Sequence, residues 1–367
     1  MTPFWPGNIE RDFSVLEGWK LRRELDRIKQ QLSMIPEMLY EPILRHKHDR
    51  AFEAGFPEHK GAVELTSKVA IFIVWQPDGL LTSTLNTCRH LHAAGYSVML
   101  ISNAPLRSDD ITAMRPYAWR IIDRPNFGYD FGGYRDGIRL LEREGIVPDN
   151  LIILNDSIYF PIFPNDDTIR KLEQSDADIS GMILRQRGEA HFLESYFYLI
   201  RGHVLRHEAF RDFWIKYPLS SNKYKTIRRG ERGFGAAMES AGLKIEGVFT
   251  EQDFQAAILA ADHGMLREIV KHAALPSRDA TQVAQSIAQN GTTEQLQAFI
   301  FSQMLKLQFY SAFPVASHSL MRFPVLKRSN NEVANAWRRE YLRAVEAGLI
   351  TPPTSTVADE LHRHRLR

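Results

Sequence analysis

Two polar clusters near the middle of the chain contain residues suited to binding an anionic ligand. The first, NFGYDFGG, spans residues 126–133, and its glycines would let the backbone approach a ligand closely. The second is Asn155-Asp156-Ser157, whose carboxylate could hold Mg²⁺ or Mn²⁺ together with phosphate oxygens. The residues predicted to contact the ligand are Asn126, Gly128, Tyr129, Asp130, Gly132, Asn155, Asp156 and Ser157, with Asp156 as the metal ligand.

A strand, a helix and a second strand are predicted to position these clusters. Residues 119–122 and 151–154 are short apolar runs typical of buried strands, and residues 134–144 have the apolar pattern of a helix. This order indicates a βαβ unit with parallel strands. Ligands of open α/β sheets lie outside the carboxyl ends of the strands, so we expect both clusters to converge there. The amides at the start of the helix would favour an anion.

Each of these residues also has a structural interpretation. The glycine-rich segment can be a tight turn, and Asp130 can cap the helix or pair with Arg135. Asp156 can form an Asx turn. Because both clusters follow predicted strands of one unit, we favour ligand binding over these alternatives.

Three residues are candidates for a general base, which a transfer to a hydroxyl group requires. They are His191, Glu194 and Glu231, and the sequence does not choose among them. His191 can equally be a structural histidine, and Glu231 can simply begin a helix. A basic segment, KYKTIRRG (residues 223–230), is predicted as a loop that either grips phosphates or is solvated.

The remaining apolar runs predict an α/β fold: a Rossmann-like, mostly parallel sheet flanked by helices. Further strands are expected at residues 68–75, 98–102, 179–184, 195–200 and 245–249, and the last of these is expected to be the final strand of the chain. We predict three regions: a helical N-terminal extension (1–66), a ligand-binding catalytic domain (67–250) and a helical C-terminal region (251–367).

Composition narrows the class of protein. The chain has 367 residues, a formal net charge of +2 and a single cysteine, Cys88. The small charge gives no reason to expect nucleic-acid binding, and one cysteine excludes an intrachain disulfide framework. The sequence contains neither a signal-peptide pattern nor an apolar run of the ~20 residues that span a bilayer. We therefore expect a cytoplasmic protein.

The two clusters, together with HFLESYFYLIRG (191–202), EAFRDFW (208–214) and FPVLKR (323–328), resemble the rhamnan synthesis protein F family. The resemblance covers roughly residues 68–328 and implies a polysaccharide-assembling glycosyltransferase. It also implies a nucleotide-sugar donor, with rhamnose as the sugar, and a cell-surface polysaccharide or lipid-linked glycan as acceptor. Peripheral contact with the inner face of the cytoplasmic membrane would follow, through Trp19-Lys20-Leu21-Arg22-Arg23 or the tail at residues 362–365.

The same clusters are similar to those of inverting glycosyltransferases with the GT-A fold, which carry a DxD-type acid after a strand. Here Asn155-Asp156-Ser157 supplies one carboxylate, which leaves dependence on a divalent metal open. At Glu194 the rhamnan synthesis family usually carries a neutral amide, which counts against this residue as base.

Two other functions remain possible from sequence. The lone carboxylate and the unidentified base slightly favour a non-catalytic glycan-binding or assembly protein with the same fold. A dinucleotide-binding enzyme is disfavoured, because the glycine-rich turn follows the third predicted strand of the sheet and lacks GxGxxG spacing.

Overall fold

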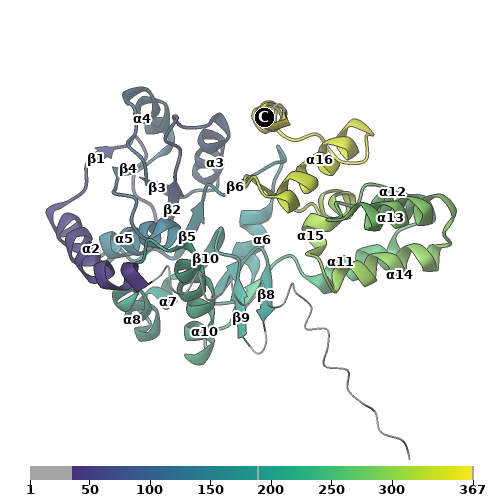
Figure 1. Ribbon diagram of the computed structural model, residues 1–367. Coiled ribbons are helices and arrows are strands. Elements are labelled where there is room, and N and C mark those ends of the chain that lie inside the picture. The colour runs from purple at the N-terminus through teal and green to yellow at the C-terminus, as the bar shows by residue number, and fades with distance from the viewer. Residues whose placement is uncertain (1–34, 188–189, 366–367) are drawn as a thin grey trace, which may run out of the picture.

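The computed structural model describes residues 35–187 and 190–365. An α/β part lies beside a helical part formed by the later residues (Figure 1). Residues 1–34 of the predicted helical N-terminal extension, with the basic-aromatic cluster at residues 19–23, lie outside the described residues.

The α/β part is built on one eight-stranded mixed sheet, in the order β1-β4-β3-β2-β5-β10-β7-β11. Strands β4, β3, β2 and β5 are mutually parallel, and β7 is parallel to β11. β10 runs antiparallel between β5 and β7, and β1 is an antiparallel edge strand. This confirms the predicted fold class. The strands are β1 (Glu58–Lys60), β2 (Lys68–Val74), β3 (Ser97–Ser102), β4 (Arg120–Asp123), β5 (Asn150–Asn155), β7 (Ile179–Gly181), β10 (Phe197–Arg201) and β11 (Ile245–Gly247).

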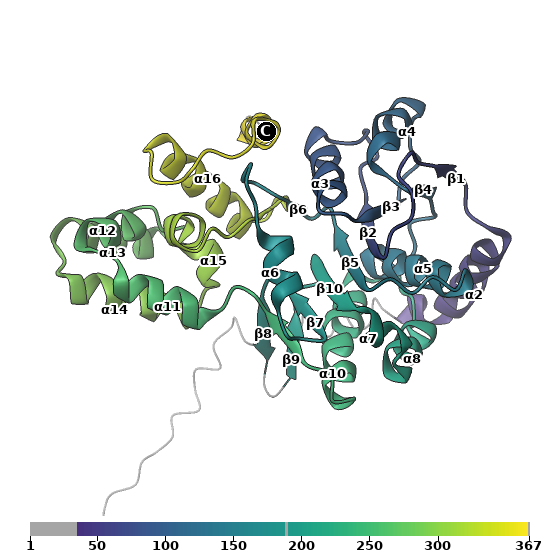
Figure 2. The same cartoon turned by 180° about the vertical axis from the view of Figure 1, so that it is seen from behind.

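Alternating side chains of the central strands enter two separate cores. Val69, Ile71 and Ile73 of β2 pack with α5 (Tyr129–Arg143), α8 (Glu208–Lys216) and α10 (Gly233–Ser240). Ala70, Phe72 and Val74 face the opposite way, toward α3 (Thr82–Ala93). A strand buried on both faces reads as a continuous apolar run, which explains why the sequence predicted these strands. Figure 2 shows the two layers from behind.

The remaining elements connect and cover this sheet. Two small antiparallel ribbons, β6–β12 and β8–β9, stand outside it. The ribbon strands are β6 (Ile158–Tyr159), β8 (Leu184–Arg187), β9 (Ala190–Leu193) and β12 (Leu326–Lys327). The covering helices are α2 (Ile35–Ala54), α4 (Ser108–Met114), the 3₁₀ helix η1 (Arg115–Tyr117), α6 (Thr168–Gln174), α7 (Gly202–Arg206), α9 (Lys223–Ile227) and the π-helix η2 (Arg228–Arg232).

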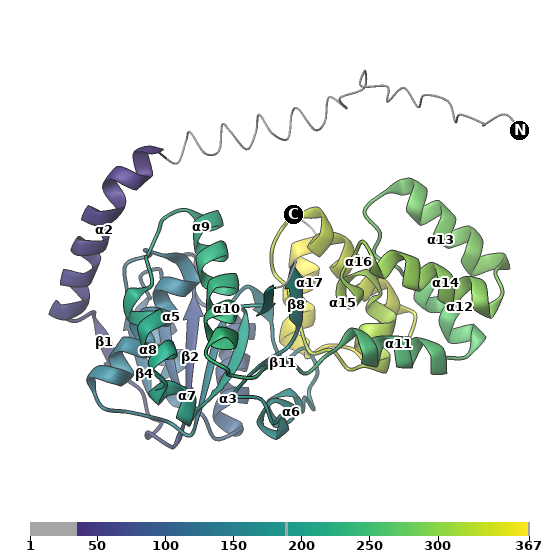
Figure 3. The ribbon, with the colours of Figure 1, turned by 90° about the horizontal axis from the view of Figure 1, so that it is seen from below.

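The helical C-terminal part shares a core with the sheet. Residues of its helices, among them Phe254, Phe313 and Trp337, belong to the same apolar cluster as Phe72 and Leu154. The last helix, α17, returns to α3, where Glu360 accepts hydrogen bonds from the backbone N and Oγ of Ser83 at 2.9 and 2.6 Å. Figure 3 shows this part from below. Its elements are α11 (Glu251–Ala260), α12 (His263–Lys271), α13 (Arg278–Asn290), α14 (Thr293–Met304), α15 (Phe309–Ala312), the π-helix η3 (Ala316–Leu320), α16 (Glu332–Glu346) and α17 (Ser355–Arg365).

Several predicted element boundaries are wrong. The helix after β4 begins at Tyr129, not at residue 134, because the chain turns at Gly128 (φ +84°) and enters α5 directly. The strand predicted at 179–184 is divided between β7 and β8, and the strand predicted at 195–200 begins at Phe197. The strand at 245–249 is not the last, since β12 follows and pairs with β6. The three predicted regions remain predictions.

Candidate functional site

The glycine-rich segment after β4 is held from beneath by a buried arginine. Arg124 donates through Nη2 to the carbonyl of Phe127 at 2.7 Å and through Nε to Oδ2 of Asp136 at 2.9 Å. His48 of α2 lies 2.8 Å from the same Asp136 oxygen. A Cβ atom on Gly132 would lie 2.1 Å from the Phe127 carbonyl oxygen, so only glycine fits this close approach. The segment is therefore a fixed turn at the start of α5.

The second cluster is tied to the end of β2. Oδ2 of Asp156 accepts hydrogen bonds from the Trp75 backbone N at 2.9 Å and from Nε2 of Gln76 at 2.8 Å. The Asx-type bond that Asp156 was alternatively expected to make is formed by its neighbour, since the Ser157 N–H donates to Oδ1 of Asn155 at 3.0 Å. Within the described ranges, Oδ1 of Asp156 has no hydrogen-bond partner.

The two clusters meet at the carboxyl edge of the sheet, as the βαβ argument predicted. Nδ2 of Asn155 donates to Oδ2 of Asp130 at 3.1 Å and to the Tyr134 hydroxyl at 2.9 Å. Burial, and then the nearby Asp156 carboxylate, raise the pKa of Asp130 to about 7. The Asp156 carboxylate therefore lies close enough to Asp130 to disfavour the charged form of Asp130. Arg135 pairs with Asp49 of α2, not with Asp130.

Asn126, Tyr129 and Ser157 occupy the rim of this region. Asn126 is exposed, and Tyr129, at φ +53°, donates through its hydroxyl to the Ser221 carbonyl at 2.9 Å. The Ser157 carbonyl accepts from the Arg328 N–H at 2.8 Å, which joins the second cluster to the segment beyond β12.

Glu194 and Glu231 lie beside the start of β10. Glu194 is buried, accepts from the Tyr310 hydroxyl at 2.6 Å, and lies 3.3 Å from Nη1 of Arg185 and 3.7 Å from Nζ of Lys327. Glu231 is half-buried, and its Oε1 accepts from the backbone N and Oγ of Ser195 at 3.1 and 2.5 Å. Glu194 is therefore fully engaged, whereas Glu231 keeps one oxygen without a described partner.

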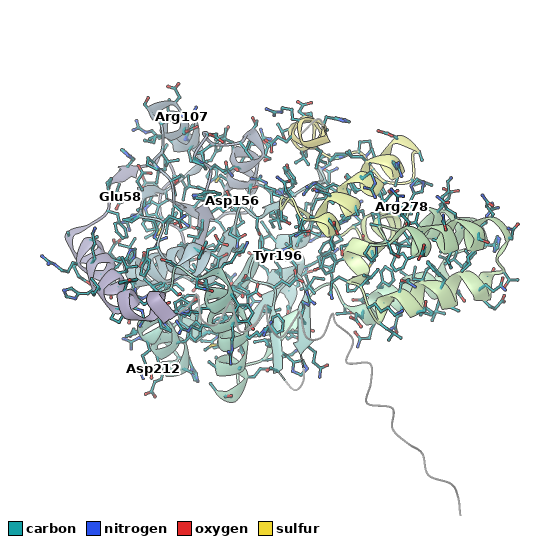
Figure 4. All side chains as sticks on the ribbon, viewed as in Figure 1. Glu58, Arg107, Asp156, Tyr196, Asp212 and Arg278 are labelled. Carbon is teal, nitrogen blue, oxygen red and sulfur yellow. The ribbon has the colours of Figure 1, made fainter. Side chains whose placement is uncertain are left out.

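Lys327 links these carboxylates to the first pair. Its Nζ lies 3.8 Å from the centroid of the Tyr196 ring, and its charge acts on both Glu194 and Asp130. Burial lowers the pKa of Lys327, and Glu194 opposes that change. Asp156 and Tyr196 lie near the middle of the molecule, between the sheet and the helical part (Figure 4).

Sequence reasoning missed Lys327, Gln76 and Tyr310. The segment FPVLKR, which contains Lys327, was noted only as part of a family pattern. No local spacing relates these residues to Asp156, because they come from separate connections that the fold brings to one edge.

His191 is placed apart from the acidic pair. It lies on β9, half-buried, with Nδ1 3.2 Å from Oε1 of Glu239. It lines a polar pocket with Arg185, Glu246 and Glu251.

The basic segment at residues 223–230 is not a loop, which corrects the prediction. It forms α9 and the start of η2. Lys225 lies 3.0 Å from Glu41 of α2 and Arg229 lies 3.9 Å from it, so both cations already have carboxylate partners. Lys223 is exposed, and its charge reaches Asp130.

No cluster of three or more histidine, cysteine or acidic side chains is arranged for a metal ion among residues 35–187 and 190–365. In the same part of the chain, no helix combines the length and apolar character needed to cross a bilayer.

The structure is thus an α/β protein in which the carboxylates of Asp130 and Asp156 and the half-buried Lys327 lie at the carboxyl edge of the sheet. The sequence model for rhamnan synthesis protein F matches residues 98–298, more than half of the chain, and the chain belongs to this family. The family predicted from the sequence is thus confirmed.

A relative and several solved structures are similar to this chain. The uncharacterized protein y4gN of Sinorhizobium fredii is 28% identical over 350 residues, covering 93% of this chain and 91% of the relative. The galactosyltransferase LgtC, solved with donor and acceptor sugar analogues, is 14% identical with a TM-score of 0.30, over 53% of this chain and 78% of its own. The glycosyltransferase GlyE of Streptococcus pneumoniae is 12% identical with a TM-score of 0.32, over 79% and 66%. These TM-scores are too low to support an inference about activity.

Proposed function

We propose that this protein is a glycosyltransferase that moves a sugar from a nucleotide-sugar donor to a growing polysaccharide or lipid-linked glycan. Family membership supports the class of reaction. The observation that carries the proposal is the meeting of Asp130, Asn155 and Asp156 at the carboxyl edge, where α/β folds bind ligands.

The donor diphosphate would be held by a divalent cation bound to carboxylates and by a lysine. A divalent cation fits Asp156 and Asp130, because Mg²⁺ takes one or two protein carboxylates and completes its shell with phosphate and water oxygens. Such an ion would supply positive charge to the departing diphosphate. Lys327 is positioned to add a protein cation next to the same carboxylates. The glycine-rich turn before α5 would let the backbone approach the diphosphate closely.

Glu231 is the best-placed general base of the three candidates. It is half-buried, and within the described residues its hydrogen bonds are made through Oε1, which leaves Oε2 able to accept a proton from an acceptor hydroxyl. Glu194 would act indirectly, by fixing Lys327 and Arg185. His191 pairs with Glu239 away from the acids.

The family name supports rhamnose as the transferred sugar, with dTDP-rhamnose as donor. A lipid-linked acceptor would bring the protein to the inner face of the cytoplasmic membrane as a peripheral protein, with His362 and Arg363 among the candidate contacts. The rival proposal, a non-catalytic glycan-binding protein, rested on a lone carboxylate, and the proximity of Asp130 to Asp156 weakens that argument.

A thermal-shift panel of nucleoside diphosphates and nucleotide sugars, with and without Mn²⁺, tests the donor site. A ligand at 100 times its Kd should stabilise the wild type by about 2.7 kcal/mol. Asp156→Ala and Lys327→Ala should each lose most of this response and most of the slow hydrolysis of the donor.

The matched controls are Asp176→Ala, at an exposed carboxylate, and Lys216→Ala, at an exposed lysine. Both should respond as the wild type does. If no nucleotide sugar stabilises the wild type and the wild type hydrolyses none, the transferase proposal fails and the glycan-binding proposal replaces it.

A further inference from the structure

A second concave site lies on the same edge of the sheet as Asp156. It is a polar pocket lined by residues of β8, β9 and β11, by residues that follow β7 and β11, and by the starts of α11 and α15. Since β7 and β11 run parallel to β5, their carboxyl ends share the edge at which Asn155 ends β5. β8 and α11, which contribute two of its walls, lie near each other in Figures 1 and 3.

The order of strands sets the distance between the two sites. β10 stands between β5 and β7, and β11 follows β7. Neighbouring strands are about 4.8 Å apart, so the pocket lies on the order of 10–15 Å along the edge from Asp156. A short oligosaccharide spans such a distance. One residue connects the sites directly, because Arg185 lines the pocket and pairs with Glu194 at 3.3 Å.

The pocket lining has the chemistry of a carbohydrate site. Glu246 and Glu251 supply carboxylate acceptors, while Gln252 and Gln308 supply amides that both donate and accept. Such groups match sugar hydroxyls, which also donate and accept. Phe249 and Phe309 provide apolar surface of the kind that lines ligand sites beneath a few convergent polar groups.

The charges that line the pocket favour a neutral glycan over an anionic ligand. The pocket carries two carboxylates, and its arginine is already paired with Glu194. His191 is likewise 3.2 Å from Glu239. Among the described lining residues, an anionic group would meet two carboxylates and no unpaired arginine or lysine, and like-charge contact disfavours binding.

We propose that this pocket binds a neutral segment of the glycan acceptor and aims its terminal hydroxyl at the site of Asp156 and Glu231. The role as acceptor subsite rests on the proposed transferase function, whereas the binding of a neutral oligosaccharide does not. The helical C-terminal part thereby supplies part of the subsite, through Gln252 and Gln308.

Isothermal titration with neutral di- to tetrasaccharides of rhamnose, mannose, galactose and glucose tests the pocket without any donor. At least one of these probes should bind the wild type. Glu251→Ala, Gln252→Ala and Gln308→Ala should each weaken that probe roughly tenfold, the effect of losing a hydrogen bond to a polar or charged group. Gln255→Ala is the matched control, because it removes the same side chain from an exposed position of α11 outside the pocket.

Donor hydrolysis, measured on the same variants, separates this inference from the transferase proposal. Unchanged hydrolysis with weakened oligosaccharide binding and slower transfer is the expected result. Oligosaccharide binding by a wild type that hydrolyses no donor would overturn the transferase proposal and leave the pocket as a glycan site. The pocket inference is overturned if no probe binds the wild type, or if the three variants bind as Gln255→Ala does. It is also overturned if the pocket variants lose hydrolysis and binding together.

Discussion

Asp130 shows what a residue-scale pattern can and cannot predict. Sequence reasoning selected both Asp130 and Asp156, because each follows an apolar strand of one predicted βαβ unit. It also counted only one carboxylate in Asn155-Asp156-Ser157, since a DxD-type rule looks for the second acid two positions away. The structure brings Asp130 from the other cluster to within 3.1 Å of Asn155. Asp130 and Asp156 lie in different loops, and the fold brings these loops together. A rule based on spacing within one short motif cannot predict that contact.

The raised pKa of Asp130 makes a signed prediction about stability and pH. Burial and Asp156 raise this pKa to about 7, against about 4 for an aspartate in the unfolded chain. Between these values the folded state holds a proton that the unfolded state has released. The contribution of Asp130 to the free energy of unfolding is therefore present below about pH 4 and is lost as the pH rises through 7. Asp130→Asn should remove this dependence.

Urea unfolding of wild type and Asp130→Asn at pH 5 and pH 8 measures this effect. Relative to wild type, the variant should gain stability between the two values, by up to about 3 kcal/mol. Asp176→Asn, at an exposed acid, should show no such gain. An equal stability difference at both pH values would mean that Asp130 is ionised throughout the range.

At the scale of elements, the buried strands could be predicted and the short polar ones could not. β2, β3 and β5 are apolar on both faces, so their sequences carry the signal. β1 is Glu-His-Lys and β12 only Leu-Lys, and each forms because a partner strand offers it an edge. The basic segment at 223–230 has no apolar periodicity, yet it is helical where Glu41 of α2 binds Lys225. Tertiary contacts therefore determine the secondary structure of such segments.

The start of α5 depends on one glycine, and a pair of substitutions should show it. In Gly132→Ala the new Cβ would lie 2.1 Å from the Phe127 carbonyl oxygen, which Arg124 already holds. This clash can be relieved only if the turn moves, so we expect the free energy of unfolding to fall by about 3 kcal/mol or more. In Gly233→Ala in α10 the new Cβ would lie 3.8 Å from Phe213 Cε2 and 3.9 Å from the Arg228 carbonyl oxygen, both ordinary contacts, so this change should stabilise by about 0.5–1 kcal/mol.

Chemical denaturation with urea compares the two alanine variants directly. A similar midpoint for both would show that the turn can open without cost, and that Phe127 and Gly132 are not in fixed contact. Donor binding by Gly132→Ala should fall as well, because the turn that brings backbone to the proposed diphosphate is the part displaced.

At the scale of the whole molecule, the helical C-terminal part completes the region around the acids. Sequence reasoning predicted a helical region at residues 251–367 and assigned it no role at the site. It shares one apolar core with the sheet and sends Tyr310, Lys327 and Glu360 back to it. Its helices were predictable from periodicity, but their contacts with the sheet were not, since those join residues more than a hundred positions apart.

Tyr310 tests how strongly the two parts are coupled. Its buried hydroxyl donates to Oε1 of Glu194 at 2.6 Å. Tyr310→Phe keeps the ring but leaves a buried carboxylate with one donor fewer, so the free energy of unfolding should fall by about 1.5–3 kcal/mol. Tyr224→Phe, at an exposed tyrosine, is the control and should change little.

A double-mutant cycle with Glu194→Gln assigns that loss to the Tyr310–Glu194 contact rather than to altered packing. If the hydroxyl acts through Glu194, removing both groups should cost less than the sum of the two single losses, with a coupling of about 1 kcal/mol or more. Purely additive losses would mean that Tyr310 stabilises the helical part alone. In that case the position of Glu194, and through it that of Lys327 beside the acids, would be set by the sheet and Arg185.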